Sequence, residues 1–416
     1  MFKRLKKFWN ILGPGVITGA SDDDPSGITT YSIAGAQSQY STLWTSLFTF
    51  PLMSAIQEMA ARIGLVTGHG LVGLMRIHYP KFLMLSIALL VIVANTINIG
   101  ADLGGMAAAS NLIFNLNPII YGFIYTFLII ITMIYVPYHT FARYLKWLTF
   151  ALFTYVLTAI IVNQNWLEII FNTIVPKISL EPKYLTLIVA IFGTTISPYL
   201  FFWQANEEVE EIEEENKVKK LKRHIVTKHE LKNMREDVTL GMFFSNLVMF
   251  FIIATTASTL FANNIHTIET ADQAARALRP LAGDASSFLF TLGIVGTGLL
   301  AIPVLAGSAA YALSEAFGWN EGLNKKFREA KAFYIVIIAS TILGFLMNLL
   351  NINPFRALFY TAVLYGILSP ILILLLLHIA NKTSIMGKHT NGPISNILGG
   401  LGFLIMSAAV IVLLVI

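Results

Sequence analysis

The chain has 416 residues, of which 56% are hydrophobic and only 12% are charged. This composition excludes an ordinary soluble domain and is typical of a polytopic helical membrane protein. The absence of cysteine excludes disulfides and thiolate ligands, and the net charge of +5 does not indicate nucleic-acid binding because basic residues lie between apolar segments.

Apolar runs of about 20 residues, long enough to cross a bilayer, occur eleven times along the chain. The predicted spans are 10–36, 42–64, 82–109, 118–137, 145–163, 183–206, 239–262, 284–312, 332–350, 356–380 and 394–416. With a cytoplasmic N-terminus, 23 of the 28 Lys and Arg residues lie on the inside. The sequence therefore predicts a single all-α transmembrane domain over 1–416 with an external C-terminus, most simply in a bacterial inner membrane.

The first apolar run is interrupted at its centre by residues 21–27, which read Ser-Asp-Asp-Asp-Pro-Ser-Gly. Proline breaks a helix, and charged side chains at bilayer depth persist only where they line a cavity or meet a partner. Freed carbonyls beside Asp22, Asp23 and Asp24 therefore predict a cation site within the membrane. The alternative is a loop at the membrane edge, where water would solvate the three carboxylates.

The sixth apolar run carries a second interruption, because Pro198 lies inside an otherwise apolar segment. Pro25 and Pro198 lie five spans apart, and paired broken helices are typical of inverted-repeat transporters with a midplane site. We therefore expect one repeat over 10–163, a second over 183–380, and an additional span at 394–416.

The longest polar segment, 206–238, begins with glutamates and continues with basic residues. This order suits a cytoplasmic helix, since acids favour its N-terminal end and bases its C-terminal end. We expect a solvated cytoplasmic face, and an acidic vestibule that concentrates cations is the alternative.

Three isolated charges need a role of their own. Glu58 and Arg62 lie four residues apart late in the second span, and this spacing favours a structural ion pair. Asp102 lies on a glycine-rich face of the third span, where we expect it to face the transport pathway or to pair with a basic residue.

Segments in four spans resemble the Nramp family of divalent-metal transporters, and the resemblance covers the first ten spans. Residues 13–15 and 24–27 resemble the first-span pattern of that family, Gly-Pro-Gly followed by Asp-Pro-Gly-Asn. Residues 193–199 resemble its sixth-span pattern, Gly-Ala-Thr-Val-Met-Pro-His, and 57–68 and 246–261 resemble its second and seventh spans. The resemblance implies the LeuT-type fold, in which spans 1–5 and 6–10 are inverted repeats with broken helices 1 and 6.

The resemblance also implies a metal site formed by the two breaks. It places the family's aspartate ligand on Asp24, its asparagine ligand on Gly27, and its carbonyl ligand on Thr194. The family's thioether ligand falls on Ser197. Glycine has no side chain to offer, so this chain departs from the family at two of the four ligand positions.

These departures favour a hard cation. Thioether sulfur helps to select transition metals, whereas carboxylate, carbonyl, hydroxyl and water oxygens suit Mg²⁺, Ca²⁺ and Mn²⁺. Mg²⁺ usually keeps several waters beside one or two carboxylates. Asp22 and Asp23 have no counterpart in the family pattern, and we expect them to bond to ion-bound water. The chain thus most resembles the Nramp-related magnesium transporters, with Mn²⁺ as a second cargo.

The proton machinery of the family is also altered. The third-span acid pair falls on Ile99 and Asp102, and the sixth-span histidines fall on Tyr199 and Gln204. Neither tyrosine nor glutamine titrates near neutral pH. We therefore expect transport of Mg²⁺ or Mn²⁺ without strong proton coupling, by a non-enzyme that has no cofactor. The expected partners are the metal ion and the lipid bilayer, without nucleic acid or an obligate protein.

Three other functions stay open. One is the ordinary proton-coupled Mn²⁺/Fe²⁺ importer of the Nramp family. Another is a LeuT-type transporter of a small organic solute, although three adjacent aspartates would repel an anionic group. The third is an intramembrane aspartyl protease, but its second aspartate needs a Gly-x-Gly-Asp setting, which Asp284 lacks.

Overall fold

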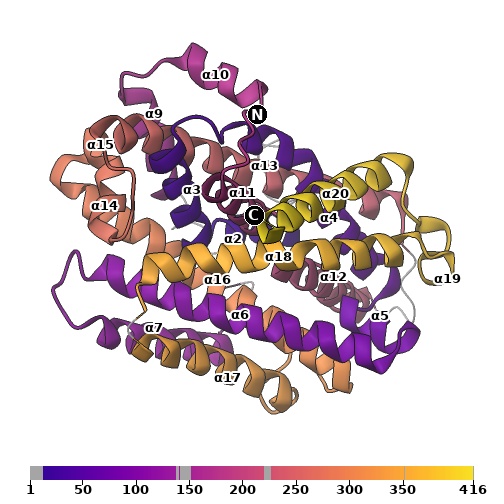
Figure 1. The fold of residues 1–416 in the computed structure, drawn as a ribbon. Helices are drawn as coiled ribbons and strands as arrows, with labels where there is room; N and C mark the ends of the chain where they lie inside the picture. Colours follow the sequence, from indigo (N-terminus) through magenta and orange to yellow (C-terminus); the bar gives the residue numbers. More distant parts are fainter. Residues whose placement is uncertain (1–12, 137–139, 141–150, 220–225, 351, 416) are drawn as a thin grey trace, which may run out of the picture.

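The computed structural model describes residues 13–136, 140, 151–219, 226–350 and 352–415, and its regular elements are helices throughout these residues (Figure 1). In chain order the α-helices are α2 (Pro14–Asp22), α3 (Pro25–Ser38), α4 (Trp44–Thr67), α5 (Leu71–His78), α6 (Lys81–Ser110), α7 (Pro118–Tyr135), α9 (Phe153–Ile161), α10 (Trp166–Ile174), α11 (Pro182–Thr195), α12 (Pro198–Lys219), α13 (Lys228–Thr259), α14 (Ala271–Ala275), α15 (Arg279–Ala282), α16 (Ser286–Phe317), α17 (Lys331–Met347), α18 (Pro354–Asn381), α19 (Thr383–Met386) and α20 (Pro393–Val415).

Both predicted breaks are present. The first span is divided into α2 and α3, which are separated by Asp23 and Asp24. The sixth is divided into α11 and α12, which are separated by Ile196 and Ser197. In each case the second helix begins with the proline, which suits the first position of a helix. Pro51, Pro303 and Pro370 instead lie inside the continuous helices α4, α16 and α18.

The other nine predicted spans correspond to α4, α6, α7, α9, α13, α16, α17, α18 and α20. Part of the fifth, 145–150, lies outside the described residues. Among the described residues, eight stretches are by themselves long and apolar enough to cross a membrane. The first, second and fifth predicted spans are not among the eight.

The broken helices lie at the centre of the molecule and the unbroken ones surround them. In the stretch 182–214, which contains the second break, 94% of the most apolar window is buried, against 22% for α20. In Figure 1, α6, α7 and α17 lie along one edge, and α2, α3 and α11 lie in the interior. Any site at the breaks is therefore enclosed by protein.

Glycines allow the central helices to approach closely. A Cβ added at Gly193 in α11 would lie 2.1 Å from the Ala362 carbonyl oxygen of α18. A Cβ added at Gly19 in α2 would lie 2.4 Å from the carbonyl of Gly241 in α13. Small residues at such contacts are the usual means of packing helices within a membrane.

The start of α2 is held by a carboxylate from another element. Asp237 of α13 accepts hydrogen bonds from the backbone N–H groups of Gly13, at 2.9 Å, and Gly15, at 2.6 Å. The first N–H groups of a helix have no partner within it and attract negative charge. This contact gives residues 13–15 a structural role in fixing α2 against α13.

Candidate ion-binding site at the two helix breaks

The first break leaves a carbonyl without its helical donor. Pro25 has no N–H, so the carbonyl of Ser21, four residues earlier, cannot form its usual helical bond. The hydroxyl of Tyr199, at the start of α12, donates to this carbonyl at 2.9 Å. Tyr199, which stands where the resemblance places a histidine of the proton pathway, therefore connects the two broken helices.

At the second break, a hydroxyl also replaces the missing helical donor, but it comes from a residue beside the break itself. Pro198 leaves the carbonyl of Thr194 without its helical donor, and the hydroxyl of Ser197 donates to it at 2.7 Å. Ser197 also lies 3.3 Å from the Gly193 carbonyl. The two residues predicted as ligands on this helix are thus bonded to each other.

Asp24 is the residue around which the first break is built. It is the N-cap of α3, and its Oδ1 accepts the N–H of Gly27 at 2.7 Å. Its Oδ2 accepts the amide Nδ2 of Asn98, in α6, at 2.9 Å. The side chain is only 2% exposed, and among the described residues no Lys or Arg forms an ion pair with it. A carboxylate in this setting attracts a cation.

Asn98 was not predicted from the sequence, and it links two acids. Its Nδ2 lies 3.4 Å from Oδ2 of Asp102, one helical turn along α6. Both side chains are fully buried. Within the described residues, Asn98 Oδ1 and Asp102 Oδ1 have no hydrogen-bond partner. Asp102 therefore faces the Asp24 site, and the alternative of a pair with a basic residue is wrong for the part of the chain described.

Asp22 and Asp23 are directed toward a different helix from Asp24. The hydroxyl of Ser245, in α13, donates to Asp22 at 2.6 Å and lies 3.4 Å from Asp23. Among the described residues, no three carboxylate or histidine side chains converge as a ligand set. The run of three aspartates is therefore divided, with Asp24 on the α6 side and its two neighbours on the α13 side.

Gly27 lies where the two breaks meet. A Cβ added there would lie 3.1 Å from the Thr194 hydroxyl and 3.5 Å from Oδ1 of Asp24. The glycine contributes its N–H to Asp24, and its backbone packs closely against both breaks.

The profile of the family described as "Natural resistance-associated macrophage protein-like", or Nramp, matches residues 15–416. The chain belongs to this family. The match spans both repeats and the additional last helix of this Nramp protein.

Curated relatives align with nearly the whole length of this chain. The "divalent metal cation transporter MntH" of Caldanaerobacter subterraneus is 24% identical over 404 residues, covering 95% of this chain and 90% of the relative. The MntH of Listeria innocua is 23% identical, covering 94% and 86%.

Solved structures establish the fold. The Eremococcus coleocola manganese transporter aligns with a TM-score of 0.75 at 17% identity, over 98% of this chain and 87% of that one. The inward-facing conformation of Mhp1 aligns with a TM-score of 0.55 at 12% identity, over 97% and 90%. The LeuT-type fold expected from the resemblance is confirmed.

Gln204, which stands where the resemblance places a histidine of the Nramp family, connects α2 to the acidic end of α12. Its Oε1 accepts the hydroxyl of Thr18 at 2.6 Å, and its Nε2 donates to Glu208 at 2.9 Å. Both side-chain groups of the glutamine are occupied by protein, so it has a structural role between the first and sixth helices.

The acidic run after the sixth helix is partly buried, which corrects the expected solvated face. Glu207, Glu208 and Glu210 are at most 7% exposed, because α12 continues without a break through Lys219. Glu210 accepts the hydroxyl of Tyr311 and two backbone N–H groups, those of residues 323 and 324 at 2.6 and 3.1 Å. The helix therefore turns this face toward the protein.

An acidic cavity of about 500 Å³ opens beside these glutamates. The charged residues that line it are Glu210, Glu213, Glu214, Glu321, Lys325 and Lys326. Burial, aided by the charge of Glu315, raises the pKa of Glu321 to about 9. Because the lining also includes two lysines, the acidic vestibule considered as an alternative above stays a prediction.

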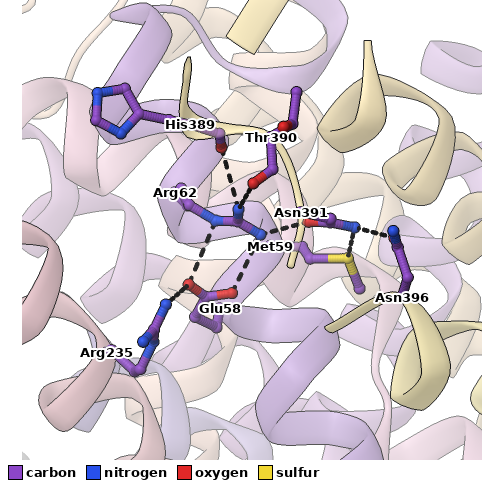
Figure 2. A network of polar contacts seen from close by, with 8 residues as sticks. All are labelled: Glu58, Met59, Arg62, Arg235, His389, Thr390, Asn391 and Asn396. Carbon is purple, nitrogen blue, oxygen red and sulfur yellow. Dashed lines mark hydrogen bonds and ion pairs between the residues drawn. The ribbon is translucent and has the colours of Figure 1, made fainter. Parts of the chain in front are cut away.

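The predicted ion pair of Glu58 and Arg62 is confirmed and belongs to a larger network (Figure 2). The Arg62 Nε lies 3.3 Å from Glu58, and Arg235 of α13 lies 3.2 Å from the same carboxylate oxygen. Arg62 also donates to the carbonyls of His389 and Thr390 at 3.1 and 3.0 Å. The network fixes α4 to α13 and to the segment before α20.

Proposed function

We propose that this Nramp protein carries hard divalent cations, Mg²⁺ first and Mn²⁺ second, across a cell membrane. The ion occupies the space between the two helix breaks and is exposed alternately to either side. Orientation follows the basic residues, with the N-terminus in the cytoplasm and the C-terminus outside. A bacterial inner membrane fits the bacterial origin of the relatives.

The observation that carries this proposal is the setting of Asp24. Its carboxylate is buried at the junction of two broken helices, receives N–H donors from Gly27 and Asn98, and has no basic partner among the described residues. Transporters of the LeuT type bind their ions at such junctions. Asp24 is the primary ligand, and the Thr194 carbonyl and Ser197 hydroxyl supply further oxygens.

The preference for Mg²⁺ rests on the two departures from the family pattern. Ser197 offers oxygen where the family offers sulfur, and Gly27 has no side chain that would replace a water of the ion. Oxygen ligands and retained water suit Mg²⁺. Asp22 and Asp23, on the α13 side, contribute negative potential from the outer sphere.

Weak proton coupling follows from the two residues that stand where the family has histidines, Tyr199 and Gln204. The Tyr199 hydroxyl is bonded to the Ser21 carbonyl, and both polar atoms of the Gln204 amide are bonded to protein. Neither side chain gains or loses a proton near neutral pH. The membrane potential, worth about 2.3 kcal/mol per charge per 100 mV and twice that for a divalent ion, provides the driving force.

The second candidate is a proton-coupled Mn²⁺ importer. Two relatives are named divalent metal cation transporter and one structural neighbour is a manganese transporter. Asp102 remains as a buried acid beside the Asp24 site and would be the proton carrier. These relatives are transporters, which argues against the protease, and the divided aspartates disfavour an anionic organic solute.

Ion uptake into proteoliposomes tests the proposal. We expect Mg²⁺ and Mn²⁺ to enter in the presence of the wild-type protein, and we expect Asp24→Ala to abolish entry of both ions. The matched control is Asp284→Ala, which removes an exposed aspartate between α15 and α16 and should transport normally. Uptake that survives in Asp24→Ala would refute the site, and Mn²⁺ uptake without any Mg²⁺ uptake would favour the second candidate.

A further inference from the structure

The Asp24 site contains the buried amide of Asn98, which uses its nitrogen but not its oxygen in hydrogen bonds. Asn98 donates its Nδ2 to the carboxylates of Asp24 and Asp102, at 2.9 and 3.4 Å, and its Oδ1 has no partner among the described residues. The side chain is fully buried in α6, within the ring of helices around the breaks. A buried carbonyl oxygen without a donor is rare and requires an explanation.

We propose that Asn98 is a ligand of the transported ion, and that its amide supplies the oxygen that Gly27 cannot. This inference rests on the proposed function, because it assigns a further residue to the same site. The amide comes from α6, in the third span, and not from the first span, where the family pattern has its asparagine.

The position of the amide supports this role. Asn98 and Asp102 lie four residues apart, so both side chains project from one face of α6 toward the first break. On this face of α6, two buried oxygens have no hydrogen-bond partner among the described residues, Asn98 Oδ1 and Asp102 Oδ1. Together with Asp24 they form the type of oxygen set that Mg²⁺ and Mn²⁺ accept.

In the structure the amide presents its nitrogen to the two acids. The Nδ2 group lies between two carboxylates and offsets their repulsion. The last torsion of asparagine has a broad, nearly two-fold profile, so the amide can turn by half a rotation at low cost. When a cation reaches Asp24, the same rotation would direct Oδ1 toward the ion. Asn98 would then be a donor to the carboxylates in one orientation and a ligand of the ion in the other.

Ion binding to the purified full-length protein, measured by titration calorimetry with Mg²⁺ and with Mn²⁺, tests this role. We expect Asn98→Leu to weaken Mg²⁺ binding by about tenfold or more. Asn98→Met replaces the amide with a thioether, and we expect it to weaken Mg²⁺ binding more than Mn²⁺ binding because sulfur is a softer ligand. In the Asn98→Leu background, Gly27→Asn should recover part of the lost affinity, since it returns an amide to the family's position.

Asn172 provides the matched control. It is 2% exposed in α10, its Nδ2 donates to the Glu168 carbonyl at 2.8 Å, and its Oδ1 also has no partner among the described residues. Asn172→Leu should bind both ions like the wild-type protein.

Two results would overturn the inference while Asp24→Ala still abolishes binding. One is wild-type affinity in Asn98→Leu. The other is an equal loss of both ions in Asn98→Leu and Asn98→Met without recovery by Gly27→Asn, which would show that Asn98 only positions Asp24. If the wild-type protein binds neither ion, the proposed function fails and the inference with it. Should Asn98→Leu fail to fold, the change in Mg²⁺/Mn²⁺ preference in Asn98→Met decides the question.

Discussion

Two hydroxyl groups replace the backbone donors that proline removes from the broken helices. Tyr199 donates to the Ser21 carbonyl and Ser197 donates to the Thr194 carbonyl. An unsatisfied backbone carbonyl within a membrane costs several kcal/mol, so these bonds make the breaks tolerable. In this chain, the residues that replace the family's histidine and methionine therefore stabilise the break.

Ser197→Met tests the selectivity attributed to this position. The substitution adds a soft thioether and removes the bond to Thr194, so we expect Mg²⁺ uptake to fall by about tenfold relative to Mn²⁺ and Cd²⁺ uptake. Ser197→Ala removes the same bond without adding sulfur and should slow all three ions alike. An unchanged Mg²⁺/Mn²⁺ ratio in Ser197→Met would contradict the role of position 197.

The elements that hold the site were largely predictable, and the contacts between them were not. Proline in an apolar run does not by itself indicate a break, since Pro51, Pro303 and Pro370 lie inside continuous helices. The aspartates before Pro25 and the resemblance to the family pattern around Pro198 located the two breaks. The role of Asn98 could not be predicted, because its spacing from Asp102 does not show which face of α6 meets the first break. Glu207 and Glu210 were expected on a solvated face, since a run of charges cannot show that backbone donors from 323–324 cover it.

A buried ion pair and an exposed one with the same spacing allow a direct comparison at the level of elements. Arg62→Ala leaves Glu58 buried with Arg235 as its remaining charged contact, and we expect a loss of about 3 kcal/mol. Arg276→Ala breaks an exposed pair with Asp272 and should cost at most about 1 kcal/mol. The measurement is the apparent unfolding temperature in detergent, and equal shifts would show that the network in Figure 2 does not fix α4.

The whole molecule has an apolar exterior around an enclosed polar centre. Large apolar side chains such as Phe123, Phe127 and Leu404 are more than half exposed on α7 and α20, whereas Asp24 is 2% exposed. In a membrane protein of this family the exterior faces lipid. The basic residues, which lie mostly on one predicted side, then set the orientation.

Because the chain has no cysteine, a single introduced thiol reports its orientation without background. α16 has 32 residues, about 48 Å of helix, so its two ends must lie on opposite sides of the membrane. We expect a membrane-impermeant maleimide to label Asp284→Cys on intact cells, and Asn320→Cys only after the cells are opened. The reverse pattern would show that the predicted orientation is wrong.

The most direct test of the central claim is to record Mg²⁺ entry and internal pH in the same proteoliposomes under an imposed inside-negative potential. We predict Mg²⁺ entry that increases with the potential, leaves the internal pH unchanged and is absent in Asp24→Ala. Acidification in step with Mg²⁺ or Mn²⁺ entry would contradict uncoupled transport and would assign the proton to a group that remains in the site, with Asp102 as the first candidate.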